Sequence, residues 1–187
     1  WMPQTRTLIG DGGATFTRNY VEVALCCPAR ATLLTGLYAH SHRVLTVDNS
    51  NGGFRQFRKR GHEKQTLAVW LRNAGYETAL VGKYLNGFPD DQPATYIPQG
   101  WSWWVAAVQR GETPYRQFDY RLNENGKLVF YGKASTAYGT DVYARKSVEF
   151  IQAQAKAEKP FFLFLSLFAP HAPATAAPRH KALFADA

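Results

Sequence analysis

A nucleophile and a cation lie within one turn of a predicted helix, in the segment Cys26-Cys27-Pro28-Ala29-Arg30. Pro28 suits the first turn of a helix, where its missing N–H has no helical partner, and Gly36 is a helix stop. The free N–H groups at a helix start attract an anion, and the Arg30 guanidinium adds a forked donor. The segment therefore predicts a nucleophile beside an anion site. The alternative is two buried cysteines next to a surface arginine.

Two familiar kinds of cysteine chemistry do not fit this segment. Thr32 and Leu33 stand where a cysteine-phosphatase loop needs its arginine. A zinc site needs further Cys or His ligands at short spacing, whereas this chain has two cysteines, and they are adjacent. Neighbouring cysteines also rarely form a disulfide with each other, because the geometry is strained.

Two further polar side chains follow predicted buried strands. Lys83 comes after Glu77–Val81, and His171 follows Phe161–Phe168 in a Pro-His-Ala-Pro loop. In open α/β sheets the active site lies at the carboxyl ends of the strands. A lysine there can hold an anionic ester, and a histidine can bind an oxyanion or protonate a leaving oxygen. Taken singly, each is more often a structural or solvated residue.

The elements that must position these residues alternate between helix and strand. Helices are predicted over 3–9, 28–34, 67–73 and from Thr140 or Asp141 to Lys159-Pro160. Strands are predicted over Glu77–Val81 and Phe161–Phe168, in strand-like stretches of 14–23, and in a hairpin of 117–122 and 127–131 around Asn125-Gly126. Segments 48–64 and 86–100 are predicted loops. This alternation indicates an α/β protein whose sheet is covered by helices.

Length and composition narrow the broad class of protein to which this chain can belong. The chain has 187 residues, of which 45% are hydrophobic and 19% charged, which suits one globular domain rather than a disordered or fibrous chain. The net charge of +8 favours anionic partners. The longest apolar run, 161–169, is far shorter than the roughly 20 residues of a membrane helix, so no membrane span is expected.

The first segment resembles the signature of the sulfatase family, Cys-x-Pro-Ser/Ala-Arg followed by Thr-Gly, at Cys26, Pro28, Ala29, Arg30, Thr35 and Gly36. In that family the cysteine is oxidised after synthesis to formylglycine, whose aldehyde hydrate is the nucleophile. The resemblance implies this change for Cys26, because Cys27 fills the variable position.

Other segments extend the resemblance over nearly the whole chain. Gly75–Tyr84 is similar to the second sulfatase motif. The features shared with the N-acetylglucosamine-6-sulfatase and arylsulfatase group are the doubled cysteine, 82–86, 100–104, 169–171 and 175–178. The resemblance implies an alkaline-phosphatase-like sulfatase core, an α/β fold with a mostly parallel sheet covered by helices.

The resemblance also implies roles for individual residues. Cys26 as formylglycine attacks the sulfur of a sulfate monoester. Arg30 and Lys83 neutralise the sulfate oxygens and hold the nucleophile. His171 assists sulfate binding or the departure of the alcohol. Lys83, His171 and Asn86 are the implied substrate-binding residues. The implied cofactor is Ca²⁺, with the Cys26-derived oxygen as one ligand and the remaining ligands absent from this chain. The implied partners are a sulfated sugar or aryl sulfate and a formylglycine-generating maturation enzyme.

The chain also departs from the family pattern. No paired aspartates follow an apolar strand near the start, and Asp90-Asp91 lies in a proline-rich loop. We therefore expect residues 1–187 to be part of one sulfatase catalytic domain that is incomplete at both ends, without the first metal-binding strand or the C-terminal part, and inactive when isolated. Arg43 replaces the usual glycine, so His40 and His42 are predicted to make local hydrogen bonds.

Two other functions stay open. A phosphonate or phosphate ester hydrolase uses the same nucleophile signature. Basic residues interleaved with Phe54 and Phe57 in segment 54–64 could instead form a polyanion-binding module, although a solvated loop is the preferred interpretation and no nucleic-acid partner is expected. The family resemblance implies a periplasmic or secreted location, or a lysosomal one in a eukaryote.

Overall fold

The computed structural model describes residues 2–48, 50–109 and 113–183. Within them the chain forms a five-stranded mixed sheet with strand order β4-β3-β2-β1-β5. The strands are β1 (Glu77–Gly82), β2 (Trp103–Ala107), β3 (Tyr120–Glu124), β4 (Lys127–Tyr131) and β5 (Phe161–Ser166). Strand β1 pairs in parallel with both β2 and β5, and the antiparallel β3–β4 hairpin extends the sheet beyond β2. The predicted α/β fold class is confirmed.

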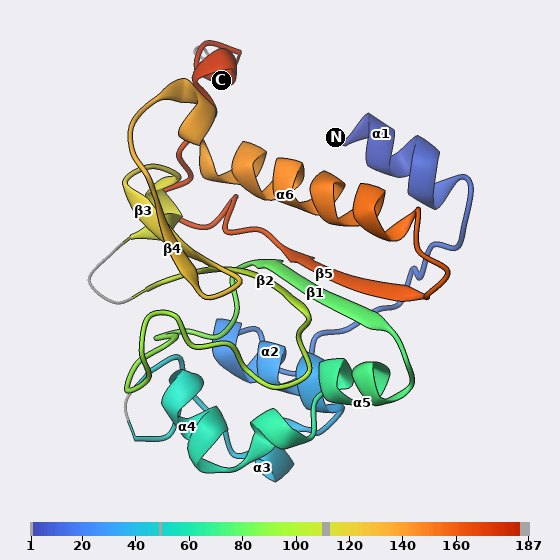
Figure 1. Ribbon diagram of the computed structural model, residues 1–187, viewed down its shortest axis with the longest axis vertical. Coiled ribbons are helices and arrows are strands. Elements are labelled where there is room, and N and C mark those ends of the chain that lie inside the picture. The colour runs from blue at the N-terminus through green and yellow to red at the C-terminus, as the bar shows by residue number, and fades with distance from the viewer. Residues whose placement is uncertain (1, 49, 110–112, 184–187) are drawn as a thin grey trace.

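Helices cover both faces of the sheet (Figure 1). The α-helices are α1 (Pro3–Thr5), α2 (Cys26–Thr35), α3 (Ala39–His42), α4 (Gly53–Lys59), α5 (Leu67–Asn73) and α6 (Gly139–Gln154). A π-helical turn follows α1 over Arg6–Gly10, and short 3₁₀ turns occupy His62–Lys64, Pro114–Arg116, Ser135–Ala137 and Pro178–His180. No helix in the described ranges has the length and apolar character needed to cross a membrane.

Alternating strand residues build two cores. On one face Leu80 and Trp104 pack with α2, α4 and α5, and on the other Val81 and Val105 pack with Val142 of α6. Successive side chains of a strand point to opposite faces, and because both faces are covered, the central strands β1 and β2 are buried along nearly their whole length. Their carboxyl ends consequently reach the same edge of the sheet between two rigid layers (Figure 1).

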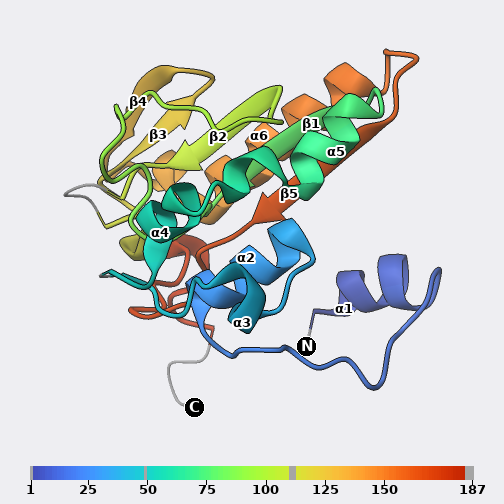
Figure 2. The same cartoon turned by 90° about the horizontal axis from the view of Figure 1, so that it is seen from below.

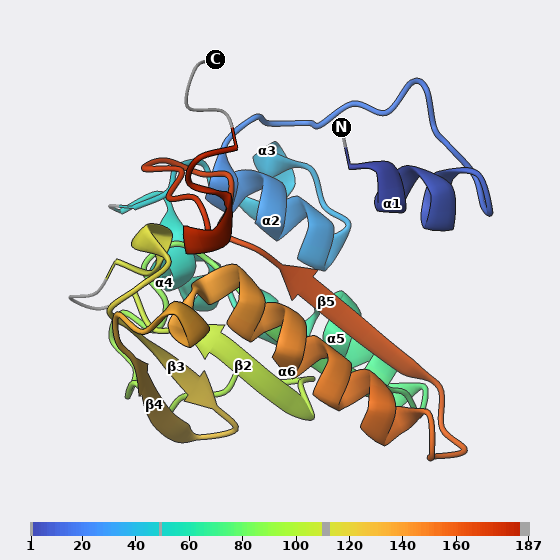
Figure 3. The same ribbon diagram turned by 90° about the horizontal axis from the view of Figure 1, so that it is seen from above.

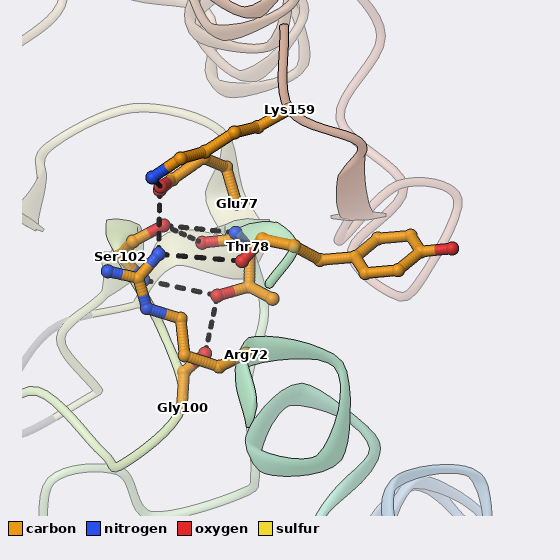
Figure 4. A network of polar contacts seen from close by, with 7 residues as sticks. Arg72, Glu77, Thr78, Gly100, Ser102 and Lys159 are labelled. Atoms are coloured by element: carbon orange, nitrogen blue, oxygen red, sulfur yellow. Dashed lines mark hydrogen bonds and ion pairs between the residues drawn. The ribbon is translucent and has the colours of Figure 1, made fainter. Parts of the chain in front are cut away.

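The unit α5–β1 follows its prediction closely. The Thr66 side chain caps α5 by accepting a hydrogen bond from the Val69 N–H at 3.3 Å. The start of β1 is tied to the segment before β2, because the Ser102 hydroxyl donates to the Thr78 carbonyl at 3.1 Å (Figure 4). Beside it the Glu77 carboxylate pairs with Arg72 at 2.8 Å and with Lys159 at 3.7 Å. These contacts fix the entry of β1.

The predicted hairpin also forms. Asn125 and Gly126 have φ of 53° and 90°, and Glu124 pairs with Lys127 in the ladder. Two consecutive residues of positive φ turn the chain with the right-handed twist that the strands need.

Three expectations about elements are wrong. Residues 14–23 form no strand; they run extended and exposed toward α2, as Figure 2 shows, because no neighbouring strand offers hydrogen-bond partners. Part of the predicted loop 48–64 is helix α4, which Phe54 and Phe57 anchor by complete burial in the core. The strand at 161–168 ends at Ser166 and is not fully buried, with Phe161 at 40% and Leu165 at 42% exposure, because β5 lies at the edge of the described sheet.

Strand β2 lies outside the strands that the sequence predicts. Its tryptophan-rich start does not alternate cleanly between polar and apolar residues. Burial of Trp104 against Tyr84 and Phe88 fixes it in place, with ring centroids 5.2 and 5.4 Å apart. This packing depends on residues far along the chain.

Candidate active site

Helix α2 presents its first residues to the carboxyl edge of the sheet. It begins at Cys26 after an extended Leu25 and ends at Gly36, whose φ of 69° suits a residue without a side chain. Cys27 and Ala31 point into the core and are fully buried. Cys26 is partly exposed, and Arg30 lies one turn further along the same helix face. The helix thus separates the two adjacent cysteines into a surface position and a core position.

The Arg30 guanidinium is fixed by acceptors at the ends of two strands. Its Nη1 donates to the carbonyls of Lys83 at 2.9 Å and Tyr84 at 3.2 Å, and to Ser166 Oγ at 2.7 Å. Burial lowers the pKa of Arg30, while electrostatic interaction with Cys26 and Tyr115 raises it. Figure 3 shows β5 directed toward α2, which is the geometry that allows this contact.

Strands β1 and β5 meet closely where this arginine binds. The Lys83 N–H donates to the Ser166 carbonyl at 2.7 Å. Gly82 has a φ of 111°, and a Cβ there would collide with that same carbonyl. Glycine is required at this position because only it permits both the backbone conformation and the close approach.

Lys83 is a buried cation. Its residue is only 3% exposed, and its Nζ lies 5.1 Å from the ring centroid of Tyr115 and 5.9 Å from that of Phe168. Within the described part of the chain no carboxylate pairs with this ammonium. A buried charge normally has a counter-ion, so Arg30 and Lys83 together form an electropositive site that suits an anionic ligand.

His171 lies beside the same aromatic rings. Its ring centroid is 4.6 Å from that of Tyr115, and its backbone N–H donates to the Phe168 carbonyl at 2.9 Å. Its Nδ1 lies 2.9 Å from the Ala172 carbonyl. Because a carbonyl only accepts, this contact places a proton on Nδ1 and leaves Nε2 available. The side chain is exposed, so Nε2 can meet a ligand.

Asn86 connects the site to a neighbouring pocket. Its Nδ2 donates to the Tyr115 hydroxyl at 3.4 Å, and its Oδ1 is buried without a hydrogen-bond partner among the described residues. Asn86 also lines a pocket of about 550 Å³ together with Arg55, Lys59 and Asp90. A second groove, of about 400 Å³, is lined by Cys26, Arg30 and Ser166 and by Val21 and residues 23–25.

The structure brings Arg30, Lys83, His171 and Asn86 together at one edge of the sheet, with Cys26 one helical turn before Arg30. Sequence reasoning missed Ser166 and Tyr115. Ser166 is a polar residue ending an apolar strand, a signal that could have marked it. Tyr115 lies in a 3₁₀ turn and carries no local signal.

The other residues considered from the sequence make structural contacts. Burial raises the pKa of the Cys27 thiol to about 11, so this thiol stays protonated near neutral pH. His42 is fully buried, its Nδ1 accepts from the Val44 N–H at 3.0 Å, and His40 stacks on Tyr38. Asp91 lies 3.5 Å from Arg58 in an exposed ion pair.

The residues present do not make up a calcium site. Calcium takes six to eight oxygen ligands, chiefly from carboxylates and carbonyls. In the described ranges no three His, Cys, Asp or Glu side chains gather in a way that could hold a metal ion.

Comparisons with known proteins agree with this geometry. The sulfatase family model matches residues 2–187. The chain is 39% identical to N-acetylglucosamine-6-sulfatase of Capra hircus and 37% identical to the extracellular sulfatase SULF-1 homolog of Drosophila melanogaster, each over 98% of this chain. It spans 33% and 16% of the length of these relatives.

A solved structure is similar to this chain in its fold. A protein in complex with its substrate D-glucosamine-2-N,6-O-disulfate superposes with a TM-score of 0.64 and 26% identity, covering 91% of this chain and 30% of that one. Both the predicted fold class and the predicted resemblance of the chain to the sulfatase family are confirmed. The chain belongs to the sulfatase family.

Proposed function

We propose that this chain provides the catalytic edge of a sulfuric ester hydrolase that cleaves sulfate monoesters. The observation that carries the proposal is the pair of cations, Arg30 and Lys83, held without a carboxylate partner among the described residues, with Arg30 one helical turn after Cys26. Preorganised cations in a partly dry site stabilise the negative charge of a sulfate ester more strongly than water does.

Each side chain has a distinct part in this proposal. The aldehyde of formylglycine, formed by oxidation of Cys26, takes up water, and one hydroxyl of this hydrate attacks sulfur as the bond from sulfur to the alcohol oxygen breaks. The second hydroxyl then loses its proton and expels sulfate, which restores the aldehyde. Arg30 is anchored by three acceptors and fixes the start of α2 against the sheet. Lys83 directs its ammonium to the sulfate oxygens. His171 donates its Nδ1 proton to the Ala172 carbonyl, and in the imidazolium form its exposed Nε2–H donates to sulfate or gives its proton to the departing alcohol oxygen.

We propose a sulfated sugar as the substrate class. The pocket beside Asn86 has about 550 Å³, within the usual size of ligand sites, and Arg55 and Lys59 line it without ion-pair partners in the described chain. Asp48 and Asp90 line it as well, so its walls are polar and of mixed charge, which suits the hydroxyl and charged groups of a sulfated sugar better than a small aryl group. Relatives named N-acetylglucosamine-6-sulfatase support this choice. The basic residues of segment 54–64 then serve the enzyme rather than a separate polyanion-binding module.

The remaining features of the proposal come from the family. We propose that a maturation enzyme oxidises Cys26, that Ca²⁺ is bound with ligands beyond those described here, and that the protein acts in a secreted, periplasmic or lysosomal location. One relative is named as an extracellular sulfatase, which supports that location.

Peptide mass spectrometry tests the proposed maturation. In the complete protein containing these residues, produced together with a formylglycine-generating enzyme, the peptide spanning 19–30 should lose about 18 Da at Cys26, the change from thiol to aldehyde. Cys27 should keep its thiol. An unmodified Cys26 in a fully active preparation would contradict the proposal.

Activity measurements test the chemistry. Cys26→Ala should abolish hydrolysis of sulfate esters, whereas Cys27→Ala is the matched control and should retain it. Turnover of a sulfate ester and of the corresponding phosphonate ester separates the two hydrolase functions, and the sulfate ester should be the better substrate. Preference for the phosphonate ester would favour the other enzyme class.

A further inference from the structure

Tyr115 contacts three of the residues assigned to the site. Its ring lies 5.1 Å from Lys83 Nζ and 4.6 Å from the ring of His171. Its hydroxyl accepts a hydrogen bond from Asn86 Nδ2 at 3.4 Å. These three partners come from the segment after β1 and the loop after β5, whereas Tyr115 comes from the turn between β2 and β3. One side chain thus joins two parts of the site.

The contact with Lys83 has an electrostatic consequence. The faces of aromatic rings carry negative charge density and attract an ammonium ion within about 6 Å. Lys83 is buried and lacks a carboxylate partner in the described chain, so the rings of Tyr115 and Phe168 offset part of its desolvation. A carboxylate in their place would neutralise the ammonium and compete with an anionic substrate, whereas a ring orients the ammonium and leaves its charge available.

The contact with His171 has a geometric consequence. The loop carrying His171 is exposed, and the imidazole is restrained by the Ala172 carbonyl on one side and by the Tyr115 ring on its face. Tyr115 is itself held against Phe168, with centroids 4.9 Å apart. Phe168 is only 3% exposed, so this ring pair is anchored in the core.

We propose that Tyr115 is a positioning residue that holds the Lys83 ammonium and the His171 imidazole in one geometry for an anionic ester. The inference rests on the proposed function, because it takes Lys83 and His171 as the residues that contact sulfate. The ring of Tyr115 supplies most of this positioning, and its hydroxyl supplies a smaller part through the hydrogen bond with Asn86.

Three substitutions separate the ring from the hydroxyl. In the complete, matured protein, Tyr115→Leu should lower kcat/KM about tenfold, the order expected for loss of a partly desolvated cation–π contact. It should raise the inhibition constant of inorganic sulfate by a similar factor. Tyr115→Phe should recover activity to within about threefold, because the ring remains. Tyr131→Leu is the matched control: this half-buried tyrosine stacks on Tyr120 in the hairpin, and the variant should keep wild-type kcat/KM.

The outcomes distinguish this inference from the proposed function. Wild-type kcat/KM and sulfate inhibition in Tyr115→Leu would overturn the positioning role, as would an equal loss in Tyr115→Phe or in Tyr131→Leu. If Cys26→Ala removes activity while Tyr115→Leu does not, only the inference fails. If Cys26→Ala stays active, the proposed function fails first.

Discussion

Arg30 and Ser166 are separated by 136 positions in the sequence, yet Arg30 Nη1 donates to Ser166 Oγ at 2.7 Å. This hydrogen bond joins the first turns of α2 to the last residue of β5. The same nitrogen also donates to two carbonyls that follow β1. The Arg30 side chain therefore helps to fix α2, and with it Cys26, over the sheet edge, in addition to the packing of Cys27, Ala31 and Leu34 in the core.

Replacing this arginine should affect both stability and activity. In Arg30→Lys the side chain is one atom shorter and lacks the planar guanidinium fork, so it cannot reach all the acceptors of Nη1. The variant should lower the free energy of unfolding by about 2–3 kcal/mol, the cost of leaving a buried polar group unpaired. We expect kcat/KM to fall at least about 100-fold, as when a preorganised charge stabiliser is removed. Ser166→Ala should give a smaller loss in the same direction. Thermal unfolding and steady-state kinetics measure both, with exposed Arg60→Lys as the control that should match wild type.

The two adjacent cysteines should differ in reactivity. In protein made without maturation, iodoacetamide near neutral pH should label the partly exposed Cys26 and leave Cys27 unmodified, because burial raises the pKa of the Cys27 thiol to about 11. Only the thiolate reacts, and access also limits the rate. Peptide mass spectrometry after native and denaturing labelling reads both sites, and labelling of both cysteines in the native protein would contradict the burial of Cys27.

Arg55 and Lys59, the cations of the pocket beside Asn86, should strengthen the binding of large sulfated substrates. Arg55→Gln with Lys59→Gln should raise KM for a sulfated oligosaccharide about three- to tenfold, with an effect that shrinks at high salt because exposed charges are screened. The KM for a small aryl sulfate should not change, since such a substrate does not extend into the pocket. Arg60→Gln, on the same segment but outside the pocket lining, is the control. Equal changes for both substrates would argue against the pocket as a sugar site.

The packing of helix α4 in the core should contribute measurably to the free energy of unfolding. Phe54 is fully buried against Phe88, with centroids 5.0 Å apart, so Phe54→Ala should lower the free energy of unfolding by about 3–5 kcal/mol. Phe16 is 83% exposed, and Phe16→Ala should change stability by less than about 0.5 kcal/mol. Denaturant unfolding of the two variants makes the comparison, and similar values would favour a solvated loop at 54–64.

His42 should make stability depend on pH. Burial lowers its pKa below the ordinary 6.5; Glu22 opposes this shift, whereas His62 and His40 add to it. Above that value the imidazole is neutral in both states and its contribution is fully present. As pH falls, the unfolded chain takes up the proton first, so stability declines until the lowered pKa of the folded state is passed.

A pair of variants isolates this contribution. His42→Asn should flatten the decline of the thermal midpoint below pH 6.5. His40→Asn, at an exposed position, should keep the slope close to that of wild type. An unchanged slope in His42→Asn would assign the pH dependence to other groups, such as the Glu22 carboxyl, whose pKa is lowered chiefly by its hydrogen bond with Thr32.

The sequence by itself determined the features that depend on neighbours in the chain. The helix that Pro28 indicates, its stop at Gly36, the cap at Thr66 and the Asn125-Gly126 turn all follow from backbone preferences acting over a few residues, although the helix begins two residues earlier, at Cys26. The signature around Cys26 and the presence of strands before Lys83 and His171 were likewise readable, although the second strand ends at Ser166 rather than at Phe168.

The tertiary structure alone decided which distant residues meet. Helix α4 formed where the local pattern predicted a loop, because burial of Phe54 outweighs the weak preference of a basic segment. Tyr115 joined Lys83 and His171 through contacts that no local signal encodes. The physical reason is that pairing of β1 with β5 brings their carboxyl ends together, and only then do the chain segments that follow them share one site.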